Sequence, residues 1–169
     1  MPSKEIELNP VDFITVGTIG PKGQRIFHLQ GGQGNQLVSL IIEKEQAWAL
    51  SEAIREMLDD LDKRKPDAED VIDLSGVDMD LREPIEPVFR VAQMGLGYDE
   101  EHDQIVLVAQ ELVSSLGGDL NEPEEIEPGV VKLWCSRQQM RMLCEYSLEV
   151  VKSGRADPKQ NGRLVYYWS

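Results

Sequence analysis

Residues 38–58 read VSLIIEKEQAWALSEAIREML, and residues 131–151 read VKLWCSRQQMRMLCEYSLEVV. In each stretch an apolar run is followed by apolar residues spaced three and four apart, which predicts a buried strand that leads into an amphipathic helix. With a constant offset of 93, six of the 21 positions are identical: Val38 and Val131, Leu40 and Leu133, Gln46 and Gln139, Leu50 and Leu143, Glu52 and Glu145, and Glu56 and Glu149. We interpret the chain as an internal duplication.

The surrounding residues predict the same order of elements in both halves. Apolar runs bounded by glycine, proline or acidic turns predict three strands in each half. They lie at residues 13–16, 25–29, 37–42, 88–94, 105–109 and 130–135. Helices are expected from about Lys44 and after Ser136, where Ser136 and Gln139 fit a capping box. The glycine-rich residues 31–34 are expected to be a turn.

The first strands of the two halves are also aligned with each other. Residues 14–20 are laid on residues 89–95, which matches Val16 with Val91 and Gly20 with Gly95. Two β-β-β-α units predict an α+β fold with a mostly antiparallel sheet and two amphipathic helices. The sequence leaves open whether the six strands form one sheet or two.

Length and composition predict a single domain over residues 1–169, because 169 residues that are 41% hydrophobic can bury one substantial core. The pseudo-repeats span about 11–65 and 86–155, an acidic linker takes 66–87, and a C-terminal aromatic tail takes 156–169. A second insertion at residues 112–129 is also expected to be a loop.

The net charge of −14 argues against direct binding of nucleic acid or of an anionic membrane, because like charges repel. The charge is unevenly spread. Residues 59–86 hold eleven acids and four bases and residues 116–130 hold five acids and no base, whereas residues 131–169 hold seven bases and three acids. We expect a polarised surface whose acidic loops could recruit a basic protein partner.

No apolar run reaches the roughly 18 residues that a membrane helix needs. Residues 1–9 lack the basic start and apolar core of a signal peptide. We therefore expect a cytoplasmic protein that does not associate with a membrane.

A glycine-rich loop offers a phosphate-binding alternative. Gly17, Gly20 and Gly23 lie close to Lys22 and Arg25, and backbone amides together with cations can hold a phosphate. A phosphate loop normally leads into a helix, whereas this one leads into a strand, so a hairpin turn is the favoured interpretation. If a ligand binds between the two repeats, the expected contributors are Gly20, Lys22, Arg25, Lys44 and Arg137.

The histidines and cysteines do not form a catalytic motif. His28 is expected in a strand and His102 in an acidic turn, and neither has a partner in the sequence that completes an acid–base site. Cys135 and Cys144 are expected to be reduced, partly buried thiols, and no catalytic residue is assigned.

Acidic residues of the linker are candidate metal ligands. Asp73, Asp78 and Asp80 supply carboxylates, but they lack the ordered spacing of a calcium loop, and a solvated loop is the favoured interpretation. No metal ion or other cofactor is expected.

Residues 164–168 read LVYYW and contain three of the ten aromatic residues of the chain. Such a run favours a strand that covers a sheet edge or a groove. Docking onto the chain's own sheet is favoured over binding another subunit, which leaves a homodimer as the alternative. The candidate partner-binding residues are Tyr166, Tyr167 and Trp168.

Three blocks of sequence carry a family resemblance. FITVGTIGPKGQRIFHLQ at residues 13–30, VSLIIEKEQ at 38–46 and FRVAQMGLGYDEEHDQIVLVAQE at 89–111 are similar to the bacterial domain of unknown function 3090 family. The resemblance covers most of residues 5–155 and implies a soluble bacterial protein with no established reaction. Family members typically end in a cysteine-rich tail that looks able to hold zinc, but residues 154–169 contain neither cysteine nor histidine.

The leading functional hypothesis is a non-enzymatic cytoplasmic protein-interaction or adaptor module. The alternative is a small-molecule or phosphate-handling enzyme with a site between the two repeats. The question of enzymatic activity is left open, leaning towards none.

Overall fold

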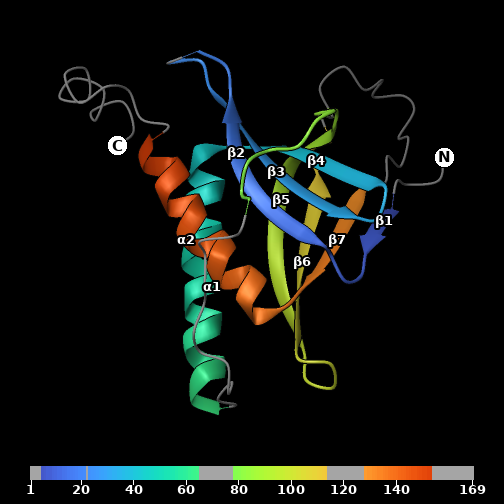
Figure 1. Cartoon of the computed structure of the whole chain (residues 1–169), viewed down its shortest axis with the longest axis vertical. Helices are drawn as coiled ribbons and strands as arrows, with labels where there is room; N and C mark the ends of the chain where they lie inside the picture. Colours follow the sequence, from blue (N-terminus) through green and yellow to red (C-terminus); the bar gives the residue numbers. More distant parts are fainter. Residues whose placement is uncertain (1–4, 22, 65–77, 114–127, 154–169) are drawn as a thin grey trace, which may run out of the picture.

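The computed structural model describes residues 5–21, 23–64, 78–113 and 128–153. These residues form seven strands and two helices (Figure 1). The elements in chain order are β1 (Glu5–Leu8), β2 (Phe13–Ile19), β3 (Ile26–Gln33), β4 (Gln36–Ile42), α1 (Lys44–Arg64), β5 (Pro87–Asp99), β6 (Gln104–Glu111), β7 (Val130–Cys135) and α2 (Arg137–Ser153).

The strands form one mixed sheet in the order β1-β7-β6-β5-β4-β3-β2. Neighbours within the groups β2-β3-β4 and β5-β6-β7 are antiparallel, whereas β4 pairs with β5 and β1 with β7 in parallel. The α+β fold with a mostly antiparallel sheet is therefore confirmed, and the strands lie in one sheet.

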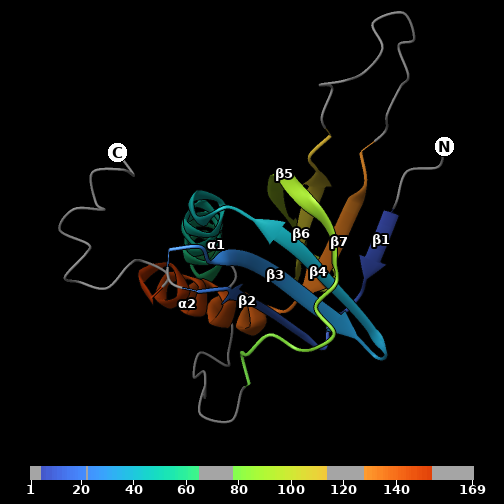
Figure 2. The ribbon, with the colours of Figure 1, turned by 90° about the horizontal axis from the view of Figure 1, so that it is seen from above.

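Residues 9–12 join β1 and β2, the two end strands of the sheet, and form hydrogen bonds with β7 and with β3. Val11 N donates to Trp134 O of β7 over 2.9 Å, and Asp12 N donates to Gly32 O of β3 over 2.7 Å. Residues 9–12 therefore connect β7 and β3, which lie towards opposite ends of the curved sheet (Figure 2). The sequence did not predict β1, whose four residues Glu5–Leu8 alternate acidic and apolar side chains.

Apolar side chains from the sheet and from one face of each helix form one buried cluster. Its largest fully buried members are Leu8, Leu29, Leu40, Ile42, Ile54, Leu61, Ile105, Leu107, Leu133, Met140 and Leu143. Burial of one leucine or isoleucine of this kind contributes about 1.5–3 kcal/mol. Both helices are therefore held by the stripe of apolar residues that the sequence pattern predicts.

The third residue of each helix is a glutamine whose side chain bonds back to the residue before the helix. Gln46 Oε1 accepts from Glu43 N over 2.7 Å, and Gln139 Oε1 accepts from Ser136 N over 2.8 Å. Ser136 Oγ accepts in turn from Gln139 N over 3.1 Å, which confirms the capping box. The amide groups of the two glutamines also make equivalent bonds, each over 3.0 Å: Gln46 Nε2 to Val91 O, and Gln139 Nε2 to Val11 O.

If the two halves are a duplication, strand pairing relates their first strands with an offset of 80 residues instead of the predicted 75. In the first half, Leu29 lies between Leu40 and Val16 and pairs with both. In the second half, Leu107 lies between Leu133 and Leu96 and pairs with both. If Leu40 and Leu133 are equivalent, Val16 therefore corresponds to Leu96, with an offset of 80. The glutamine bonds give the same offset, because they relate Val11 to Val91.

The strand boundaries differ from the prediction in two further places. Gly31 and Gly32 lie buried inside β3 instead of in a turn, and a Cβ atom at Gly32 would clash with the Phe13 ring. Only Gly34, with φ of 59°, has the left-handed backbone that favours glycine in this turn. The strand β5 continues to Asp99, well beyond the expected end, so the turn before β6 is shorter.

Candidate functional site

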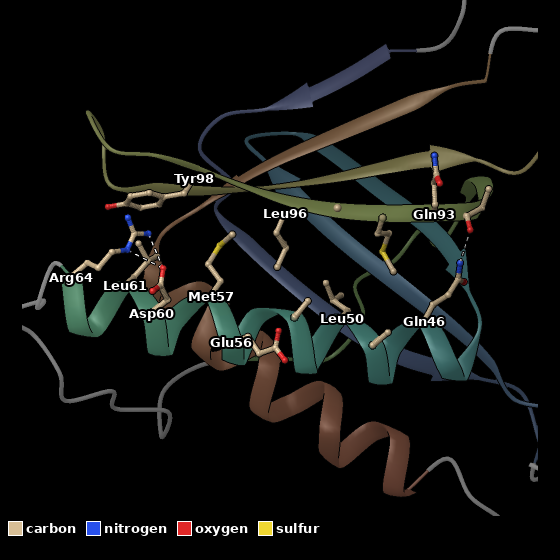
Figure 3. A pocket seen from close by; sticks show the side chains of 15 residues that line it. Gln46, Leu50, Glu56, Met57, Asp60, Leu61, Arg64, Gln93, Leu96 and Tyr98 are labelled. Carbon is tan, nitrogen blue, oxygen red and sulfur yellow. Dashed lines mark hydrogen bonds and ion pairs between the residues drawn. The ribbon is translucent and has the colours of Figure 1, made fainter. Parts of the chain in front are cut away.

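A groove of about 660 Å³ lies between helix α1 and strand β5 (Figure 3). Leu50 and Met57 of α1 point towards Leu96 of β5 across the groove. Polar and charged side chains line the ends and the rim. The full lining comprises Gln46, Ala49, Leu50, Ala53, Glu56, Met57, Asp60, Leu61, Arg64, Ala92, Gln93, Met94, Gly95, Leu96 and Tyr98. We call this feature the α1–β5 groove.

One wall of the α1–β5 groove is a strand edge. The pairing of β4 with β5 ends at Arg90, and among the described residues only β6 pairs with residues 93–99. The second edge of this part of β5 therefore carries backbone groups without a strand partner in the described chain. An edge of this kind can pair with another extended segment.

The other wall is open because α1 carries small residues there. Ala49 and Ala53 lie one helical turn apart and line the groove. With the offset of 93, their counterparts in α2 are Met142 and Tyr146. The same face is therefore bulky in the second helix and small in the first.

With the offsets of 93 for the helices and 80 for the first strands, the region beside α2 and β2 corresponds to the α1–β5 groove. It is covered by residues 78–82, which we call the covering segment. Thr15 Oγ1 of β2 donates to Met79 O. The Leu81 side chain packs so closely on Gly17 that a Cβ atom there would lie 2.6 Å from Leu81 Cγ. Asp80 and Leu81 also line a cavity of about 310 Å³ together with residues of β2 and α2, among them Tyr146.

A buried glutamine fixes the end of the covering segment. Gln30 Nε2 donates to Arg82 O over 2.8 Å, and Arg82 N donates to Gln30 Oε1 over 2.7 Å. Gln30 also donates to Ser39 Oγ over 3.0 Å, and the Arg82 guanidinium lies 3.6 Å from the centre of the Phe13 ring. The outer side of β2 and β3 is thus closed by the chain itself.

No described segment covers the corresponding part of β5. Gly95 and Gly97 of β5 take the places of Thr15 and Gly17 when the sheet offset of 80 is applied. A Cβ atom at Gly95 would meet no heavy atom of the described chain within 4 Å. Among the described residues, the covering segment thus packs beside β2 and α2, and no segment packs in the same way beside residues 93–99 of β5.

Polar contacts mark the two ends of the groove. At one end Gln46 Nε2 donates to the carbonyl oxygens of Val91 and Ala92, over 3.0 and 3.3 Å (Figure 3). At the other end Arg64 pairs with Asp60 over 2.9 Å. Glu56 is exposed on the rim between them, so the rim offers acidic groups to an incoming segment.

Arg137 is buried at the start of α2 and contacts two carboxylates that are partly exposed. Its Nε atom donates to Asp103 Oδ1 over 2.9 Å, and its Nη1 atom lies 3.7 Å from Asp62 Oδ1 near the end of α1. Desolvation acts to lower the pKa of Arg137, but its interactions with Tyr98 and Asp103 outweigh this and raise the pKa. The guanidinium therefore stays charged and holds the start of α2 to the end of α1 and to the turn between β5 and β6.

The described residues among the five proposed for a ligand site lie on three parts of the fold. Gly20 and Arg25 belong to the β2–β3 hairpin, where Gly20 has φ of 114°, and Lys22 lies outside the described residues. Lys44 is the first residue of α1, whereas Arg137 contacts Asp62, eighteen residues further along α1. At 1.5 Å per residue, this separates Lys44 from Arg137 by about 27 Å. The structure does not bring these two residues into one site.

The two histidines have different surroundings. His28 is buried in β3 with Nδ1 3.1 Å from Ile26 O, and burial lowers its pKa. His102 is exposed in the turn after β5, with Nδ1 2.7 Å from Asp99 Oδ2, and hydrogen bonding to His102 lowers the Asp99 pKa. Ligand atoms of Asp99, Glu101 and His102 lie within 4.8 Å of one another, which is an exposed group that could hold a cation.

Both cysteines are free and buried. Burial raises the pKa of Cys135 to about 12 and also raises that of Cys144, whose Sγ donates to Ser51 O over 3.3 Å. Neither thiol is therefore ionised near neutral pH, as a nucleophile would require. Of the candidate metal ligands in the linker, Asp73 lies outside the described residues, whereas Asp78 and Asp80 lie in the covering segment.

The tail residues Tyr166, Tyr167 and Trp168 also lie outside the described residues. None of the described helices is long and apolar enough to cross a membrane.

The fold and the groove define an α+β protein whose curled mixed sheet is flanked by two helices. The chain belongs to the family described as "Protein of unknown function (DUF3090)", whose model matches residues 6–161. This match confirms the resemblance seen in the sequence. No curated protein and no solved structure matches the chain.

Proposed function

We propose that this chain is a protein-interaction module whose α1–β5 groove binds an extended polypeptide segment. The observation that carries the proposal is the uncovered edge of β5 opposite Ala49 and Ala53. Backbone groups on a strand edge supply hydrogen bonds to an added strand, and adjacent apolar pockets select its side chains.

The lining of the groove supports a segment with alternating apolar side chains. Met94, Leu96 and Tyr98 recur at every second position of β5 and are partly buried against the core. Leu50, Met57 and Leu61 of α1 supply the facing apolar surface. A segment laid along β5 would direct every second side chain into this space, because strand side chains alternate between faces.

The rim supports a preference for basic residues. Glu56 is exposed on the α1 side, where Asp60 pairs with Arg64, and the chain carries a net charge of −14. Attraction of this kind speeds encounter and weakens as salt is added. We place the module in the cytoplasm, where its free thiols would stay reduced.

Selection from a displayed peptide library tests the proposal. Full-length protein should enrich peptides with alternating apolar and basic residues. Their binding should weaken at least about tenfold in Ala53→Leu, which fills the groove, because 1.4 kcal/mol of lost contact corresponds to tenfold. Asp59→Leu is the matched control, since Asp59 is exposed on α1 but does not line the groove.

Two results would overturn the proposal. One is selection that enriches no peptide family over a resin without protein. The other is enriched peptides that bind both leucine variants equally well, because their site would then lie elsewhere on the molecule.

A further inference from the structure

We propose that residues 164–168 of this chain, LVYYW, dock in the α1–β5 groove of the same molecule. This inference rests on the proposed function and names a first occupant of the site. A partner segment would then compete with residues 164–168 for the groove.

The composition of the segment fits the groove. Leu164, Tyr166 and Trp168 fall on one side of an extended strand, because side chains alternate between its faces. Aromatic and β-branched residues favour strands, and each aromatic side chain can bury 150–250 Å². On α1, the alanines at positions 49 and 53 leave the space that Met142 and Tyr146 occupy on α2.

The segment can reach the groove. The helix α2 ends at Ser153, and both views show its end beside the start of α1 (Figures 1 and 2). Residues 154–163 provide ten residues of chain, which span up to about 33 Å when extended. The helix α1 is only about 10–12 Å across with its side chains, so the chain can pass around it.

Charge favours the same placement. Residues 154–163 contain Arg155, Lys159 and Arg163 against one acid, Asp157. The helix that they would pass carries exposed acids, including Glu56 and Asp60 at the groove itself. Opposite charges on the two parts lower the free energy of the docked state, most strongly at low salt.

The molecule already closes the counterpart region in this way. The covering segment packs Leu81 on β2 beside Tyr146 of α2, and side-chain hydrogen bonds from Thr15 and Gln30 fix its backbone. A second covering segment at β5 would give both halves of the sheet the same protection from solvent.

Intramolecular disulfide formation in the full chain tests this inference. Ala53→Cys is combined with Tyr166→Cys in one variant and with Val165→Cys in another, so that either face of the docked strand is sampled. A disulfide needs Cα atoms about 4.4–6.8 Å apart. We expect one of these pairs to oxidise to a cross-linked monomer about tenfold faster than Asp59→Cys combined with Tyr166→Cys.

The other outcomes decide against the inference. Cross-links that form only in dimers would assign the groove to a second copy of the chain. Oxidation no faster than in the control pair would show that residues 164–168 do not occupy the groove.

Peptide binding separates this inference from the proposed function. If residues 164–168 occupy the groove in nine of ten molecules, removing them raises the affinity for a selected peptide about tenfold. Full-length protein with Leu164→Ser, Tyr166→Ser and Trp168→Ser should show that gain. If the affinity of this triple variant is unchanged while Ala53→Leu still loses binding, the inference is wrong and the proposed function is unaffected.

Discussion

Arg137 Nε donates a hydrogen bond to Asp103 Oδ1 over 2.9 Å, although only 2% of the Arg137 side chain is exposed. The same carboxylate oxygen accepts from Tyr98 Oη over 2.6 Å. Since Tyr98 lines the α1–β5 groove, this pair connects the start of α2 to one end of the groove.

Replacing Asp103 with asparagine should destabilise the protein by about 1 kcal/mol, because the amide oxygen can still accept from Arg137 but no longer carries the negative charge that pairs with it. Asparagine tolerates the left-handed backbone at this position, where φ is 50°. Urea unfolding measures the change. Glu101→Gln in the same exposed turn should stay within about 0.5 kcal/mol of wild type. Equal effects of both variants would show that the negative charge of Asp103 contributes nothing to stability.

The covering segment should depend on Gln30. Gln30→Leu leaves the Arg82 amide and carbonyl groups without their side-chain partner, which should cost about 1–3 kcal/mol. Hydrogen exchange should become faster at Arg82. The control Gln36→Leu changes an exposed glutamine and should leave exchange at Arg82 as in wild type. Unchanged exchange in Gln30→Leu would mean that other contacts hold the segment.

A pair of glycine substitutions compares the filled and open regions. Gly17→Ala should cost about 1–3 kcal/mol, because its new Cβ atom would overlap Leu81. Gly95→Ala meets open space and should be neutral or slightly stabilising. Thermal unfolding distinguishes them, and Leu81→Ala should relieve part of the cost at Gly17. Destabilisation by Gly95→Ala as large as that by Gly17→Ala would show that another segment packs on Gly95 as closely as Leu81 packs on Gly17.

Stability should fall above pH 9 through Cys135. Its thiol ionises at about 9.0 when unfolded, but burial raises the pKa to about 12 in the fold, so alkaline solution favours the unfolded state. Between these values the unfolding free energy should drop by about 1.4 kcal/mol per pH unit. Comparison with Cys135→Ala isolates this contribution. Identical pH slopes for the two proteins would exclude it.

Local patterns were sufficient to predict most of the framework. The apolar spacing gave the helices that begin at Lys44 and Arg137, and the serine and glutamine of the capping box occupy the predicted places. The α+β class followed from the order of these elements. Each of these features depends on residues a few positions apart.

Features that depend on distant partners were missed. The strand Glu5–Leu8 is short and half acidic, and it is defined by its pairing with β7. The first strands were misaligned because β5 is continuous, whereas its counterpart is divided into β1 and β2 around Pro10, which cannot donate a backbone hydrogen bond.

The sequence alignment of the two helices already contains a signal for the groove. Comparing the two helices position by position places Ala49 and Ala53 against Met142 and Tyr146, which is a clear loss of volume on one face. The sequence does not state that this face lies beside an edge of β5. That edge exists because the pairing of β4 ends at Arg90, which is a property of the sheet register.

The parallel pairing of β1 with β7 sets an order for assembly. Glu5 pairs with Val130, 125 residues later in the chain, and the Trp134 indole donates to Glu7 Oε2 over 2.7 Å. Pairings of such long range make folding slow, because closing a long loop costs conformational entropy before the pairing contributes any stability. During synthesis, β1 therefore leaves the ribosome before the other strands of the sheet, and it can pair with β7 only after β2 to β6 have been made.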